Sequence, residues 1–298
     1  MIELAETDAD EAITGVEDLA LTPDGDRLIL SAFDRRDPSR PDGGLYSVSL
    51  ASLSGATRVT ARRLDAARER PFRPHGIALS TDGGRLAVIN HHSDRVSSVE
   101  IGPLDTEGWA PDREIADPRF CRANDLIFVE KDEGEALRVT IDRADCRVSI
   151  RDLIGGTGRV ALIQGDRVKI EREGLHFPNG ITRAWVAETR ADRLASISGT
   201  GGVIHLPGGP DNLDERDGRI TAALHPHLLR TGLFIAGWLL SSGSRIVSIN
   251  PESHEVETLF DDPEGTIFAG ATVAVFTGGR LIAGAARDSG LLYCEAPE

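Results

Sequence analysis

A short turn motif recurs along the chain between pairs of apolar segments. Asp24-Gly25-Asp26-Arg27-Leu28 returns as Asp82-Gly83-Gly84-Arg85-Leu86, and looser copies are Asp217-Gly218-Arg219-Ile220 and Gly278-Gly279-Arg280-Leu281. An Asp-Gly or Gly-Gly step between two apolar runs is typical of a tight β-hairpin, because such turns need residues with positive φ. The motif therefore predicts a repeated antiparallel hairpin, and hence a chain built mainly of short strands.

A pair of mostly polar residues stands just before the first strand of each repeat. The six pairs are Glu17-Asp18, His75-Gly76, Asn124-Asp125, Asn179-Gly180, Asp211-Asn212 and Ala271-Thr272. Most intervals between them fit a four-stranded propeller blade of roughly 40 to 60 residues, and the interval before Asp211 is the shortest. Six starts predict an all-β, six-bladed β-propeller that occupies residues 1–298 as a single domain.

The segment after Thr272 is short for a complete four-stranded blade. We therefore expect residues before Glu17 to supply the missing strand. Pairing the two chain ends in this way would close the ring and remove its open edges.

Composition narrows the partners and the compartment. The formal net charge is -15, which disfavours nucleic acid and anionic membranes as partners. The first residues lack the basic and apolar regions of a signal peptide, and the longest apolar stretch, Leu233 to Leu240, is too short to span a bilayer. Three cysteines, Cys121, Cys146 and Cys294, are read as free thiols. These features predict a cytoplasmic protein with reduced cysteines.

The polar pairs predict a metal site in the central tunnel. The first strand of each blade lines the channel of a propeller, so the six strand starts should meet at one mouth. Carboxylate and amide oxygens are hard ligands that suit Ca²⁺ better than a transition metal. Glu17 and Asp211 would neutralise one calcium, with neutral oxygens from Asn124, Asn179 and Asn212. Asp18 and Asp125, the second members of their pairs, would hold a second and deeper calcium.

These segments resemble the paraoxonase/arylesterase family of calcium-dependent lactonases. The matching segments are Gly15-Val16-Glu17-Asp18-Leu19, Pro74-His75-Gly76-Ile77, Val88-Ile89-Asn90-His91, Asn124-Asp125-Leu126, Phe177-Pro178-Asn179-Gly180-Ile181, Asp211-Asn212, His225-Pro226, Thr272-Val273-Ala274 and Leu292-Tyr293-Cys294-Glu295. They fall in order across nearly the whole chain.

The resemblance implies roles for individual residues. A catalytic calcium would be held by Glu17, Asn124, Asn179, Asp211 and Asn212, and a structural calcium by Asp18, Asp125 and the backbone carbonyl of Ile77. His75 and His91 would form a dyad above the catalytic metal, and His225 is assigned to the pocket wall. Secreted members join their chain ends by a disulfide, whereas no cysteine here precedes Cys121. Ring closure is therefore expected to be non-covalent.

The expected activity is hydrolysis of a small-molecule lactone or aryl ester. Calcium would polarise the carbonyl, and His75, positioned by His91, would take a proton from the attacking water. Asp211 is the alternative base or nucleophile. Two other functions stay open at this point. One is a sugar-lactone hydrolase, which would need one metal and no dyad, and the other is a non-catalytic calcium-binding scaffold.

Overall fold

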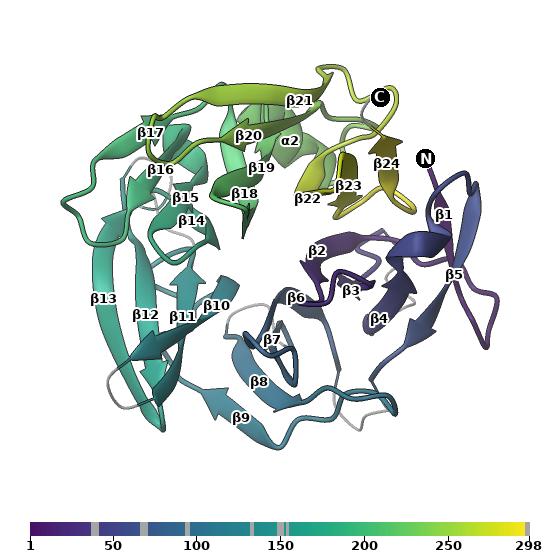
Figure 1. Ribbon diagram of the computed structural model, residues 1–298. Helices are drawn as coiled ribbons and strands as arrows, with labels where there is room; N and C mark the ends of the chain where they lie inside the picture. Colours follow the sequence, from purple (N-terminus) through teal and green to yellow (C-terminus); the bar gives the residue numbers. More distant parts are fainter. Residues whose placement is uncertain are drawn as a thin grey trace.

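The strands of the chain form six sheets set around a central axis (Figure 1). The computed structural model describes residues 1–36, 42–65, 71–92, 96–131, 134–147, 152 and 155–295. Within these residues, four sheets have four strands, the first has five and the last has three. The chain is thus an all-β, six-bladed β-propeller, which confirms the fold predicted from the repeat.

Each blade runs outward from an inner strand that carries one of the six pairs. The inner strands are β2 (Val16–Leu21), β6 (Pro74–Leu79), β10 (Ala123–Lys131), β14 (Pro178–Ile181), β18 (Gly209–Arg216) and β22 (Ala271–Thr277). The second strands are β3 (Arg27–Ala32), β7 (Arg85–Asn90), β11 (Gly134–Ile141), β15 (Trp185–Glu188), β19 (Arg219–His225) and β23 (Arg280–Ala285). The pairs therefore meet around the central tunnel.

The outer strands complete the blades. The third strands are β4 (Gly44–Ser49), β8 (Ser98–Pro103), β12 (Gly158–Gln164), β16 (Arg193–Ser196), β20 (Ser244–Ile249) and β24 (Leu292–Glu295). The fourth strands are β5 (Arg58–Arg63), β9 (Arg113–Ala116), β13 (Arg167–Leu175), β17 (Val203–His205) and β21 (Val256–Asp262). Among the described residues, the short 3₁₀ turns η1 (Leu50–Ser52) and η2 (Thr189–Ala191) and the helix α2 (Leu228–Ile235) connect strands.

The predicted hairpin turns join the first and second strands, and side-chain bonds brace them. Thr22 Oγ1 donates to Asp24 Oδ1 at 2.5 Å, and that same oxygen accepts the backbone N–H of Asp26 at 3.1 Å. Ser80 and Asp82 repeat the arrangement in the next blade, at 2.6 Å. A short polar side chain that bonds the backbone two residues on favours a turn over a continued strand.

The short interval before Asp211 has a simple structural cause. The fourth blade is built from strands of only four, four, four and three residues, β14 to β17. A complete blade therefore fits into fewer residues, and the count of six is unaffected.

The expected closure of the ring is wrong in its detail. β1 (Glu3–Glu6) does not join the last blade as its fourth strand but pairs in parallel with β5 of the first blade. The last blade is reached by isolated bridges, Ile2 to Leu291 and Thr14 to Ser289. The amino-terminal segment thus fills the seam between the two blades, and its buried Ile2 and Leu4 join the core there. No disulfide joins the two chain ends among the described residues, as expected.

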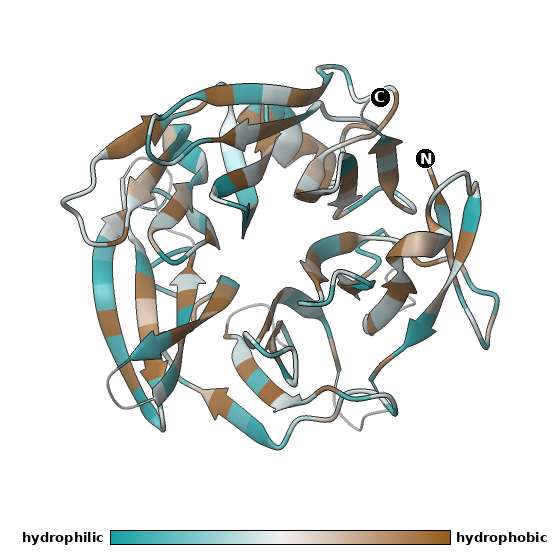
Figure 2. Ribbon diagram, viewed as in Figure 1, coloured by the Kyte–Doolittle hydropathy of each residue, from teal (hydrophilic) through white to brown (hydrophobic). Residues whose placement is uncertain are grey.

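The hydrophobic core lies between neighbouring blades rather than at the centre. One cluster combines β2 and β3 residues such as Leu28 with Val273 and Ile282 of the last blade, and another joins the second and third blades. Hydrophobic and hydrophilic residues alternate along many strands (Figure 2). Burial of such side chains stabilises by roughly 1.5–3 kcal/mol each. Apolar packing between blades leaves the axis free for polar groups.

Two of the three predicted free thiols are instead bonded to each other. Cys121 and Cys146 form a disulfide, and Cys294 is free. Cys121 lies just before β10 and Cys146 just after β11, and the antiparallel pairing of Ala123 with Ile141 brings these ends together. Cysteine number alone carries no information on such proximity, so the expectation of three free thiols is wrong for this pair.

Candidate active site

The ladder between the first two strands is interrupted in every blade at the predicted pair. Register shifts fall at Val16/Asp18, Pro74/Ile77, Ala123/Leu126, Pro178/Ile181, Pro210/Leu213 and Ala271/Val273. An irregularity of this kind frees local backbone from the ladder and re-aims side chains. Six coincident interruptions therefore turn the pairs toward the tunnel.

Two of the pairs end in glycine because neighbouring inner strands approach too closely for a side chain. A Cβ at Gly76 would stand 2.5 Å from the backbone oxygen of Asn124, and one at Gly180 would stand 2.5 Å from the backbone nitrogen of Leu213. The inner strands of adjacent blades are thus in backbone contact at the mouth. This closeness brings side chains from different blades within bonding distance.

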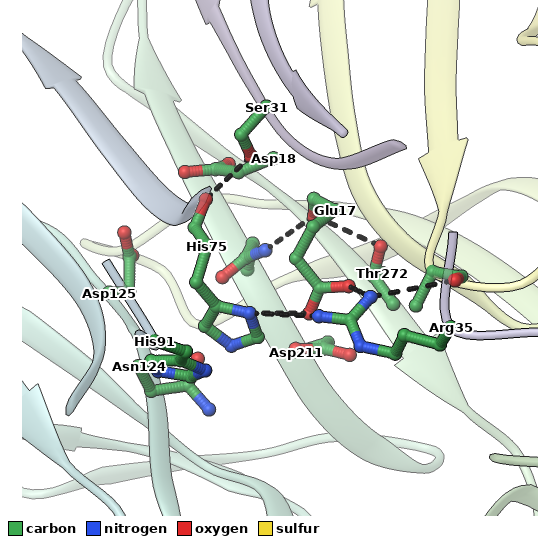
Figure 3. A network of polar contacts seen from close by, with 12 residues as sticks. Glu17, Asp18, Ser31, Arg35, His75, His91, Asn124, Asp125, Asp211 and Thr272 are labelled. Carbon is green, nitrogen blue, oxygen red and sulfur yellow. Dashed lines mark hydrogen bonds and ion pairs between the residues drawn. The ribbon is translucent and has the colours of Figure 1, made fainter. Parts of the chain in front are cut away.

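Glu17 sits at the centre of a polar network (Figure 3). Arg35 Nη1 donates to its Oε2 at 2.8 Å, and His75 Nδ1 lies 3.5 Å from its Oε1. Its backbone oxygen accepts bonds from Asn212 Nδ2 and Thr272 Oγ1, both at 3.0 Å. Glu17 is only 6% exposed, so its carboxylate depends on these partners. Three inner strands, β2, β18 and β22, are tied together at this residue.

The two predicted catalytic histidines are neighbours. The rings of His75 and His91 stack with centroids 4.3 Å apart, and both residues are buried. His91 Nε2 lies 2.6 Å from the backbone oxygen of Ala123, which can only accept, so this nitrogen carries the proton. The contact between the rings is stacking, and His75 makes its polar contacts with Arg35 and Asn124.

Both imidazoles are held neutral. Burial, followed by the positive charges of Arg35 and Arg122, sets the pKa of His75 well below its usual range. Burial and the adjacent His75 ring do the same to the pKa of His91. A neutral imidazole has a lone pair, which a general base requires.

Asn124 connects this pair to a buried acid. Its Nδ2 donates to Asp142 Oδ1 at 3.0 Å, which leaves the amide oxygen facing away from Asp142. Burial raises the pKa of Asp142 to about 6. Asp142 therefore fixes which way the Asn124 amide points.

Asp211 and His225 form a second buried pair at the mouth. His225 Nε2 lies 2.7 Å from Asp211 Oδ2, and Asn179 also bonds Asp211. Burial raises the pKa of Asp211, against the opposing effect of His225. His225 was assigned to the pocket wall, and the structure places it in direct contact with a predicted calcium ligand.

Two amide oxygens at the mouth are buried without a partner. Asn179 Oδ1 and Asn212 Oδ1 accept no hydrogen bond from any residue in the described part of the chain. A buried, unsatisfied oxygen costs roughly 1–3 kcal/mol unless something binds it. These oxygens, with the carboxylates of Glu17 and Asp211, are a hard donor set, and the residues present fit a calcium ion. Among the described residues no three His, Cys, Asp or Glu form a metal cluster, because amides make up most of this set.

Asp18 and Asp125 lie deeper, as alternation along the strands predicts. Asp18 Oδ2 accepts the backbone N–H of Ile77 at 2.7 Å, and Asp125 Oδ2 accepts that of Ile181 at 2.9 Å. Burial and the charge of Asp125 raise the pKa of Asp18 well above its usual value. Burial raises the pKa of Asp125 to about 7. The two mutually repelling carboxylates line a cavity of about 480 Å³ that extends toward the hairpin end of the tunnel.

Three residues contribute to the site without having been predicted from the sequence. Arg35 and Arg122 reach the histidines from loops, and Asp142 follows the second strand of its blade. The repeat marks only the inner strands, so nothing in the sequence singled these out. Every residue predicted for the two calcium sites and the dyad does lie on β2, β6, β10, β14 or β18, or just after β7.

Comparison with known proteins supports the propeller fold. No protein-family model and no curated protein matches the chain. A gluconolactonase from Xanthomonas campestris is 16% identical, with a TM-score of 0.53 over 97% of this chain and 91% of that one. A putative TolB from Agrobacterium tumefaciens is 15% identical, with a TM-score of 0.53 over 95% and 90%.

A third likeness extends to a larger enzyme. The acylaminoacyl peptidase of Pyrococcus horikoshii is 12% identical, with a TM-score of 0.51 over 95% of this chain and 44% of that one. At such identities the likeness shows the propeller fold alone. No helix in the described part of the chain has the length and apolar character needed to cross a bilayer.

Proposed function

We propose that this protein is a calcium-dependent hydrolase that opens lactones and cleaves aryl esters. The observation that carries the proposal is the pair of buried, unpartnered amide oxygens of Asn179 and Asn212 beside the carboxylates of Glu17 and Asp211. The stacked His75–His91 pair beside this set adds a base that a scaffold would not need. The ordered motifs that resemble paraoxonases support the same activity.

The proposed ligands divide into two sets. Glu17, Asn124, Asn179, Asp211 and Asn212 would hold the catalytic calcium. Asp18, Asp125 and the backbone carbonyl of Ile77 would hold a structural one, whose charge would offset the repulsion between the two carboxylates. When bound, the catalytic calcium would supply Lewis acidity toward the substrate carbonyl.

Residues of the chain itself would accept the proton of the attacking water and orient the reacting groups. The lone pair of His75 Nδ1 would accept a proton from the attacking water, and the stacked His91, anchored to the Ala123 oxygen, would keep the ring in place. Asp211 is the alternative base, and its bond to His225 would orient it. The buried mouth excludes bulk water and strengthens these interactions.

A sugar lactone is the competing substrate class. The gluconolactonase likeness favours it at the level of fold, whereas the second pair of buried carboxylates and the histidine pair favour a two-calcium lactonase. Nucleic acid and anionic membranes are poor partners for a chain of net charge -15. A cytoplasmic location stays a prediction. Free thiols were one reason for it, and the Cys121–Cys146 disulfide means that this reason no longer holds.

The test is hydrolysis of a panel of aliphatic, acyl-homoserine and sugar lactones and aryl esters by the purified protein. Each assay is run with a chelator, and again after calcium is restored. Turnover that the chelator abolishes and calcium restores is the expected result, and the panel ranks the substrates. A folded protein that binds calcium but turns over no lactone or ester would contradict the proposed hydrolase activity. That result would favour the alternative function, a non-catalytic calcium-binding scaffold.

A further inference from the structure

Arg35 occupies an unexpected position in this site. It lies in the loop after β3, and its guanidinium reaches between two groups of the proposed machinery. Nη1 donates to Glu17 Oε2 at 2.8 Å, while Nη2 lies 3.1 Å from His75 Nδ1. Figure 3 shows the guanidinium set against the Glu17 carboxylate, with the His75 ring next to it. One side chain thus engages a proposed calcium ligand and the proposed base together.

The guanidinium and a divalent cation make conflicting demands on Glu17. The Glu17 side chain is only 8% exposed, so its carboxylate has little access to other counter-ions, and Arg35 supplies the neighbouring positive charge. A dication bound to the same carboxylate would stand a few ångströms from a permanent positive charge. Repulsion at that distance is strong where water is largely excluded.

The same contact occupies the lone pair of His75. A guanidinium has only donors, so His75 Nδ1 must be the acceptor in this contact. The nitrogen that would take a proton from water is therefore engaged while Arg35 is in place. Release of Arg35 would free the carboxylate and the lone pair in one movement.

Arg35 is held loosely enough to leave. Its side chain is 22% exposed, and among the described residues its other contacts are a 3.5 Å bond to the backbone oxygen of Ala286 and a position 5.8 Å from the Phe33 ring. None of these is a buried carboxylate that would fix the guanidinium by itself. The adjacent Arg36 contacts Asp34 and has no described contact with Glu17 or His75.

We propose that Arg35 is a built-in competitor of calcium for Glu17, and that calcium binding displaces it and thereby frees His75 for catalysis. The proposal rests on the proposed calcium site. It makes Arg35 a positioning residue that couples occupancy of the metal site to the availability of the base.

Calorimetric titration of calcium into the metal-free full-length protein tests the competition. Arg35→Gln removes the charge, Arg35→Lys keeps it, and Arg36→Gln is the matched control from the adjacent position. Glu17→Gln identifies the binding step that belongs to this site. We expect Arg35→Gln to lower the Kd of that step by about tenfold or more, Arg35→Lys to restore most of the wild-type value, and Arg36→Gln to leave it unchanged.

The possible outcomes separate the two proposals. Unchanged or weaker calcium binding by a folded Arg35→Gln, as judged by circular dichroism, would overturn the competition while the calcium site stands. If the wild type shows no calcium-binding step that is lost in Glu17→Gln, the proposed calcium site itself is contradicted. If Arg35→Gln fails to fold, Arg35→Lys and Arg35→Met are titrated in its place, and a Kd for Arg35→Met equal to wild type contradicts the competition.

Nitrogen NMR of the histidines provides a second readout that does not depend on turnover. Calcium should shift the His75 Nδ1 signal, assigned by its loss in His75→Gln, from that of a bonded acceptor to that of a released one. In Arg35→Gln the released signal should be present before calcium is added. A His75 signal that calcium leaves unchanged in the wild type would argue against displacement.

Discussion

Asp18 and Ile77 join the inner strands of the first two blades by a single 2.7 Å bond from a backbone N–H to a buried carboxylate. Asp125 repeats the bond two blades on, to Ile181 at 2.9 Å. In the blade that follows each acid, Gly76 and Gly180 let the next inner strand approach. Acid and glycine thus alternate along the tunnel wall over the first four blades, and the acid bonds the neighbouring strand across the gap.

Asp18→Asn should weaken this contact between the inner strands of the first two blades. The Asp18 carboxylate accepts hydrogen bonds from the backbone N–H groups of Leu19 and Ile77. In the variant, the amide NH₂ group would face one of these N–H groups, so two donors would meet and one hydrogen bond would be lost. Leaving a buried N–H unpaired costs about 1 to 3 kcal/mol. The neutral amide also relieves the repulsion with Asp125, so the free energy of unfolding should fall by less than this amount. Chemical denaturation measures it, with the exposed Asp8→Asn as control. Equal stability of the two variants would refute the structural role.

Gly76→Ala should be more damaging than its size suggests. The new Cβ would meet the backbone oxygen of Asn124 at 2.5 Å, and backbone on both sides is fixed by neighbouring strands. We expect a loss of about 1 to 3 kcal/mol in stability. Gly232→Ala in α2 is the matched control, because nothing lies within 4 Å of its Cβ and alanine favours a helix. In thermal unfolding, Gly76→Ala should lower the Tm, whereas Gly232→Ala should raise it.

The repeat predicted the blades well because turn chemistry is local. Asp24 and Asp82 make their turns with residues two positions away, so a short window of sequence contains the whole cause. The inner-strand pairs were found for the same reason. The closure of the ring was misjudged because β1 could pair with either edge of the seam, and long-range packing rather than local sequence chose β5.

The chemistry of the site was less accessible from the sequence. Arg35 and Asp142 lie in segments without a repeat, and only the fold brings them to Glu17 and Asn124. The Cys121–Cys146 bond likewise depends on strand pairing that no spacing rule reveals. Positions on the inner strands could thus be predicted, whereas the loops that complete the site could not.

His75→Gln decides between the two candidate bases. If His75 takes the proton, kcat for the best lactone of the panel should fall about 10² to 10⁴-fold while calcium binding persists. Asp211→Asn removes both the alternative base and a calcium ligand, so its calcium affinity must be measured beside its turnover. A His75→Gln enzyme that keeps nearly full turnover would assign the proton transfer to Asp211.

Cys121→Ser should destabilise the chain through the loop that it opens. The two cysteines are separated by 25 positions, and closing a loop of that size stabilises a protein by roughly 3 kcal/mol. The backbone beside Cys121 carries Arg122, Ala123 and Asn124, so the His91 anchor should loosen too. Denaturation with and without dithiothreitol measures the effect, and Cys294→Ser should change nothing. Alkylation of all three cysteines in the unreduced, denatured wild type would contradict the bond.

Tyr46 should make the fold sensitive to alkali. The phenol is buried against the first blade, where burial above all raises its pKa from 10.0 to about 12. The folded chain therefore keeps this proton between pH 10 and pH 12, where the unfolded chain loses it. Its contribution to stability is complete below pH 10 and is lost as the pH rises toward 12.

Tyr46→Phe isolates this effect. A shift of that size corresponds to about 2 to 3 kcal/mol, so wild type should lose that much relative to the variant across this range. Below pH 10 the wild type should be equal or slightly more stable, because its hydroxyl lies 3.4 Å from Glu6 Oε2. Denaturant unfolding at a series of pH values gives the difference, and tyrosinate absorbance gives the ionisation directly. Parallel stability curves for the two proteins from pH 9 to 12 would mean that Tyr46 ionises as freely in the fold as in the unfolded chain.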